Sequence, residues 1–72
     1  MIIPTDVIIG VIKKWSQKND QGPSFLELQS ALAEAMRTPV DGVDLGDALD
    51  DLKSVGQIIE DLSGHYNVRK GI

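Results

Sequence analysis

Residues 44–68, DLGDALDDLKSVGQIIEDLSGHYNV, decide the fold because the hydrophobic period changes within them. In the first half the leucines recur at helical spacing, which predicts a helix over residues 44–55. Gly56 suits the left-handed position that commonly follows a helix C-terminus. Beyond Gly56 apolar and polar residues alternate, so the second half predicts a β-hairpin over residues 57–68.

The loop of this hairpin sets its register. A three-residue loop over residues 62–64, with Gly64 in the left-handed conformation, pairs Ile58 with Val68. Since strand residues alternate between faces, Ile58 then turns towards the helices and Ile59 faces outward. An exposed Ile59 is a candidate for contact with a partner.

The N-terminal segment predicts another helix over residues 5–18. Thr5 is placed to cap it, and its apolar stripe ends at Trp15, which we expect to close the core. The β-branched run over residues 7–9 also suits a strand. The length of the apolar pattern and the capping signal favour the helix.

Capping residues mark the starts of the other two helices. Ser24 and Glu27 have the spacing of a capping box, which predicts a helix over residues 25–37. The C-terminal helix begins near Asp41 or Asp44, and either side chain is able to cap it.

The composition is that of an ordinary globular protein, with 42% hydrophobic and 25% charged residues. We expect one domain over residues 1–72, mainly α with a small β-hairpin, ending in a mobile tail over residues 69–72. There is no cysteine and His65 is the single histidine, which excludes disulfides, thiol nucleophiles and Cys/His zinc sites. We therefore expect no enzymatic activity, cofactor, metal site or small-molecule substrate.

No targeting or membrane segment is recognisable. The N-terminus lacks the basic start of a secretory signal, and the apolar run over residues 7–12 is shorter than the roughly 20 residues of a membrane span. These features predict a cytoplasmic protein that makes no contact with membranes.

Negative charge is concentrated in one segment. The chain has 11 acidic and 7 basic residues, giving a net charge of −4. Acids and bases balance over residues 1–40 and again over residues 56–72. The excess therefore lies in residues 41–55, where aspartates accumulate around Lys53.

The pattern of Ala48 and Leu49 before Gly56, followed by Gly64 and Tyr66, resembles the end of a winged-helix domain, in which the last helix feeds a two-stranded wing. The resemblance implies an α-α-α-β-β fold. It also implies DNA binding, with the third helix in the major groove and the wing on the backbone.

The charge of the predicted third helix departs from this pattern. Its groove-facing positions would be aspartates, which repel phosphates, whereas affinity for duplex DNA depends on Lys and Arg. The acidic residues are also compatible with a solvated helix face that keeps the protein soluble. They do not have the spacing of an EF-hand calcium loop.

Two function hypotheses remain. The first is a protein-interaction module that offers the acidic helix to a basic partner, or that self-associates through the broad apolar face of the helix over residues 5–18. A DNA mimic or anti-repressor is a variant of this first hypothesis, and the sequence does not distinguish the two. The candidate residues for the first hypothesis are Asp44, Asp47, Asp50, Asp51 and Ile59.

The second hypothesis is a DNA-binding transcriptional regulator that uses basic residues of the N-terminal helix and the wing. Few charges are present, so we expect it to bind as a dimer, which doubles them. The candidate residues for the second hypothesis are Lys13, Lys14, Lys18, Lys53, Arg69 and Lys70.

Overall fold

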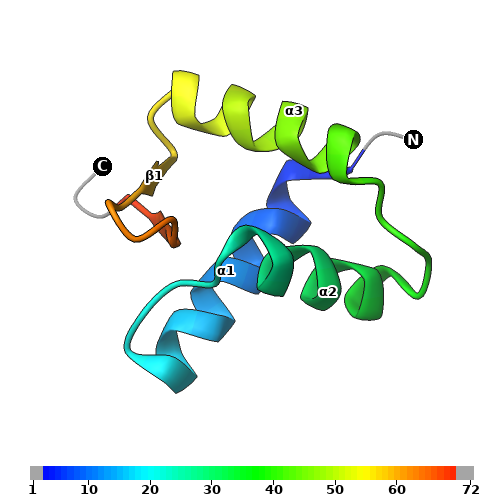
Figure 1. Cartoon of the computed structure of the whole chain (residues 1–72), viewed down its shortest axis with the longest axis horizontal. Helices are drawn as coiled ribbons and strands as arrows, with labels where there is room; N and C mark the ends of the chain where they lie inside the picture. The colour runs from blue at the N-terminus through cyan, green and yellow to red at the C-terminus, as the bar shows by residue number, and fades with distance from the viewer. Residues whose placement is uncertain (1–2, 70–72) are drawn as a thin grey trace.

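A computed structural model describes residues 3–69 as three helices followed by a two-stranded antiparallel hairpin (Figure 1). The fold class predicted from the sequence, mainly α with a small β-hairpin, is confirmed. In chain order the elements are α1 (Thr5–Asn19), α2 (Phe25–Met36), α3 (Gly42–Ser54), β1 (Ile58–Glu60) and β2 (Tyr66–Val68).

The first helix begins at residue 5 as predicted, but Thr5 does not cap it. Thr5 lies inside α1, and Pro4 occupies the cap position without a side-chain hydrogen bond. Of the two caps predicted for the third helix, Asp41 is the N-cap, so the helix begins at Gly42 rather than at residue 44. The side chain of Asp41 makes no capping bond, and its carbonyl accepts from the backbone N–H of Leu45 at 3.0 Å. The turn before the first buried leucine is therefore already helical, although the hydrophobic pattern starts only at that leucine.

The capping box of α2 is confirmed. The Ser24 backbone N–H donates to Oε1 of Glu27 at 3.0 Å, and Oγ of Ser24 accepts from the Glu27 backbone N–H at 3.3 Å. The bond from the Ser24 N–H lowers the pKa of the Glu27 carboxyl, because it favours the charged form. The helix ends at Met36, one residue early, where Arg37 takes a left-handed φ of 55°.

The hairpin has the predicted register. Ile58 pairs with Val68, and Ile59 pairs with Asn67. Gly64 has the expected positive φ, 83°. Ile58 is buried while Ile59 faces outward and is half-exposed, so the alternation predicted for the two faces is confirmed.

Backbone hydrogen bonds extend the hairpin beyond its two strands. Arg69 N–H donates to the carbonyl of Gln57 at 3.0 Å, so Arg69 continues the ladder rather than starting a mobile tail as predicted. The rest of that tail, residues 70–72, lies outside the described residues. On the other edge, Tyr66 N–H donates to the carbonyl of Pro23 at 2.9 Å, which places β2 between β1 and the segment before α2.

Gly22 allows this close approach. A Cβ at Gly22 would overlap the backbone carbonyl of Tyr66 and would lie 2.8 Å from the side-chain oxygen of Asn67. The α1–α2 connection and β2 can therefore touch only through a residue without a side chain.

One apolar core holds the elements together. Helix α1 packs against both α2 and β2, and α3 packs against β1. Trp15, expected in this core, is half-buried and lies outside it, whereas Val7 and Ile9 pack against it. The buried core side chains are Ile3, Ile8, Ile12, Leu28, Leu32, Val40, Leu45, Leu49, Leu52, Ile58 and Tyr66.

Candidate functional site

The outer side of α3 is acidic. Asp47, Asp50 and Asp51 are exposed. Asp47 lies three residues before Asp50 and four before Asp51, so the three side chains share one side of the helix. We call these three residues the acidic face. Val43 lies on the same side and is 70% exposed. Within residues 3–69, Asp47 and Asp51 form no ion pair.

Asp44 does not belong to the acidic face. It is half-buried and already takes part in an interaction of its own. It lies three residues before Asp47 and therefore borders the acidic face, from which its burial and this interaction distinguish it. The structure therefore divides the aspartates that the sequence grouped together.

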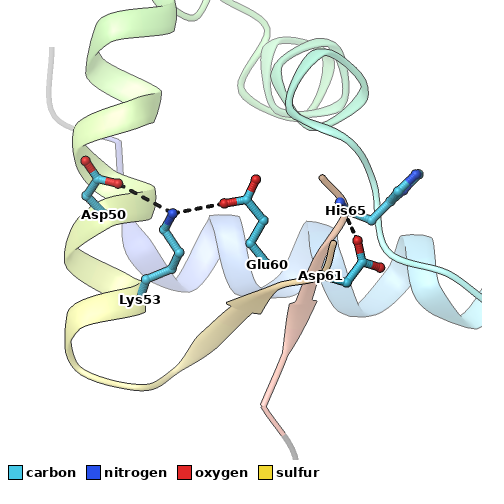
Figure 2. A network of polar contacts seen from close by, with 5 residues as sticks. All are labelled: Asp50, Lys53, Glu60, Asp61 and His65. Carbon is cyan, nitrogen blue, oxygen red and sulfur yellow. Dashed lines mark hydrogen bonds and ion pairs between the residues drawn. The ribbon is translucent and has the colours of Figure 1, made fainter. Parts of the chain in front are cut away.

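Lys53 is held by its own chain, between α3 and β1 (Figure 2). Its Nζ donates to Oε1 of Glu60 at 3.1 Å and lies 3.7 Å from Oδ1 of Asp50. It also lies 5.9 Å from the centre of the Tyr66 ring. The hydrogen bond to Glu60 raises the pKa of Lys53. A phosphate contact by Lys53 would have to replace these interactions.

Other candidate residues meet in a groove between α1 and the outer side of the hairpin. This hairpin groove, with a volume of about 960 Å³, brings Lys13 of α1 together with Ile59 and Arg69. Ile59, which the sequence grouped with the aspartates, therefore lies beside two cations instead. The full lining is Lys13, Ser16, Gln17, Asp20, Ile59, Asn67, Val68 and Arg69.

Lys14 and Lys18 line a different hollow. It lies between α1 and α2, has a volume of about 470 Å³ and includes Trp15 and Glu34 in its wall. The lysines of α1 are thus divided between two sides of the helix. Of the remaining basic candidates, Lys70 lies outside the described residues.

His65 is half-buried. Its Nδ1 lies 2.7 Å from the carbonyl oxygen of Gly22, and since a carbonyl only accepts, Nδ1 carries the proton. The Asp61 carboxylate accepts from the backbone N–H of His65 at 3.0 Å (Figure 2). It also accepts from the backbone N–H of Ser63 at 2.9 Å. The imidazole therefore joins the hairpin to the α1–α2 connection.

Neither a metal centre nor a membrane-spanning helix is found in the described part of the chain. No group of three or more histidine, cysteine, aspartate or glutamate side chains there is placed to hold a metal ion. None of the helices described combines the length and hydrophobicity needed to cross a membrane.

Sequence reasoning missed two exposed apolar side chains at the ends of the acidic helix. Val43 is 70% exposed and Val55 is 67% exposed. Val43 falls outside the leucine stripe of α3. This position relative to the stripe could have predicted from the sequence that Val43 is exposed. Val55 follows the last residue of α3, where helical spacing no longer determines its direction.

Comparisons with protein-family models, with curated proteins and with solved structures found no match to this chain. The likeness to a winged helix therefore rests on the order of the elements. Three helices followed by an antiparallel hairpin are compatible with that layout.

Proposed function

We propose that this chain is a non-catalytic binding module on a winged-helix scaffold, whose acidic face binds a protein with a basic surface. The observation that carries the proposal is the exposure of Asp47 and Asp51 without a cation from residues 3–69 beside them. Opposite charges across an interface accelerate association and select the partner. Exposed Val43 adds apolar area at one end of the same surface.

The acidic face argues against the DNA-binding mode that the winged-helix resemblance implies. A helix placed in the major groove lies between two phosphate backbones, so the three carboxylates would repel them. Lys53 does not offset this charge, because Glu60 and Asp50 already surround its ammonium group.

A second candidate is a DNA-binding transcriptional regulator that uses the hairpin groove. The observation in its favour is that Lys13 and Arg69, far apart in the sequence, line one groove. Phosphate contacts from two elements fix the orientation of a protein on DNA. Asp20 in the same lining lowers the net charge of that groove, and Lys14 and Lys18 lie on the other side of α1.

A nuclear magnetic resonance titration of the isotope-labelled protein tests the proposal. The protein is titrated with a lysine-rich peptide and, separately, with a random-sequence DNA duplex. We expect the peptide to shift the backbone amides of α3 around Asp47 and Asp51. The double variant Asp47→Asn/Asp51→Asn should bind the peptide roughly tenfold more weakly, a loss of about 1.4 kcal/mol.

The matched control is Asp6→Asn/Glu34→Gln, which removes the same charge from exposed positions on α1 and α2. It should keep the affinity for the peptide within about twofold. Peptide binding that the α3 variant leaves unchanged would contradict the proposal. Saturable, salt-sensitive binding of the duplex at Lys13 and Arg69 would instead establish the second candidate.

A further inference from the structure

The hairpin groove has the features of a docking surface. Its wall combines the cations of Lys13 and Arg69, partly offset by the carboxylate of Asp20, with the apolar side chain of Ile59. Ile59 is 50% exposed although it belongs to a strand next to the core. Neither cation forms an ion pair within the part of the chain described, residues 3–69.

The molecule itself carries the complementary surface. The acidic face supplies carboxylates, and Val43 and Val55 at the ends of the same helix supply exposed apolar area. The two surfaces therefore match in charge, and both contain apolar side chains that association would cover.

We propose that the hairpin groove binds the acidic face of a second copy of this chain. This rests on the proposed function, in which the acidic face is the binding surface, and it adds the partner. In the contact, Lys13 and Arg69 of one copy pair with Asp47 and Asp51 of the next. Ile59 packs against the exposed Val43 of α3 in that copy.

The contact is heterologous, because it joins two different surfaces. No residue of α3 lines the groove, so one molecule offers both surfaces at once. Each added copy leaves one open groove and one open acidic face. Such an interface builds open chains or rings rather than stopping at a twofold dimer.

Sedimentation velocity of the purified full chain tests the proposal. At about 20 mM salt the average mass should rise with protein concentration, and at about 0.5 M salt it should return to that of one chain, because salt screens exposed charges. Two variants remove one surface each: Lys13→Ala/Arg69→Ala and Asp47→Asn/Asp51→Asn. Each alone should associate at least roughly tenfold more weakly than the wild type.

Mixing these two variants gives the sharpest result. The groove of the α3 variant and the acidic face of the groove variant are both intact, so one contact forms and growth then stops. We expect an equimolar mixture to sediment at twice the mass of one chain. A reciprocal twofold dimer would regain only one of its two contacts in this mixture, and its wild type would stop at two chains instead of growing with concentration.

The matched control for the groove is Lys14→Ala/Lys18→Ala, which removes the same charge on the other side of α1 and should associate like the wild type. A wild-type chain that stays monomeric at about 20 mM salt at every concentration would overturn the proposal. If such a chain still binds the lysine-rich peptide through α3, only the partner is wrong. If it binds neither, the proposed function fails as well.

Discussion

Ile58 and Ile59 are neighbours of identical chemistry with opposite environments. Ile58 is 1% exposed and Ile59 is 50% exposed. The side of the hairpin that carries Ile58 closes the core with α3, whereas the side that carries Ile59 opens on the hairpin groove. The comparison teaches that one side of this small hairpin serves stability and the other side is open for binding. Single substitutions on the two sides therefore distinguish the two roles.

The largest effect comes from breaking the core side. Ile58→Ala should lower the free energy of unfolding by about 2–5 kcal/mol, because it leaves a cavity in a closed core. A domain of this size has only about 3–5 kcal/mol of stability, so the variant should be largely unfolded. Urea unfolding followed by circular dichroism measures the difference.

The matched control is Ile59→Ala, the same change one residue later. It should lower the free energy of unfolding by less than about 1 kcal/mol, since the side chain of Ile59 is already half-exposed. Equal losses at the two positions would contradict the division between the two sides of the hairpin.

Gly22→Ala tests what places the hairpin. A methyl group at Gly22 overlaps the Tyr66 carbonyl, so the α1–α2 connection and β2 must move apart. We expect the free energy of unfolding to fall by about 1–3 kcal/mol in the same urea experiment. Gly10→Ala is the control: its Cβ meets nothing within 4 Å inside α1, so the variant should gain about 0.5–1 kcal/mol. A neutral Gly22→Ala would show that the hairpin does not depend on this contact.

Local chemistry explains which parts of the fold could be predicted from the sequence. The hairpin register follows from alternation and from Gly64, whose φ is 83°. The start of α2 follows from the Ser24 capping box. The start of α3 was predicted only as one of two positions, because Asp41 and Asp44 are both able to cap a helix. Asp41 is the N-cap, but its side chain makes no capping bond, so side-chain chemistry could not decide between the two.

The candidate surfaces were predictable only where one element forms them. Helical spacing sufficed to place Asp47, Asp50 and Asp51 on one face. The hairpin groove requires Lys13 and Arg69 to approach through tertiary packing of α1 against β2, which no local pattern encodes. The hydrogen bond from Lys53 to Glu60 could not be predicted for the same reason, since the two residues belong to different elements.

A smaller effect concerns the capping box of Ser24 and Glu27 at the start of α2. The pKa of Glu27 is lowered in the folded protein from the ordinary value of 4.5, so ionised Glu27 stabilises the fold above that pH. This contribution is lost as pH falls through the lowered pKa. Glu27→Gln keeps a capping oxygen but does not titrate, so the advantage of the wild type should shrink in acid. Urea unfolding at pH 7 and below the lowered pKa measures this, and a constant difference would contradict it.

The smallest effect comes from the charges that border the core side of the hairpin. A double-mutant cycle of Lys53→Gln and Glu60→Gln should give a coupling energy of about 0.2–1 kcal/mol, since both side chains are about one-third exposed and water screens the pair. The pKa of Lys53 is raised, so the stabilisation that depends on the charge of Lys53 is present below the ordinary value of 10.5 and is lost as pH rises through the raised pKa. Lys14 and Glu34 share a hollow without an ion pair within residues 3–69, so their cycle should give no coupling. A coupling for Lys53 as large as the loss in Ile58→Ala would mean that charge, rather than the buried isoleucine, holds β1 against α3.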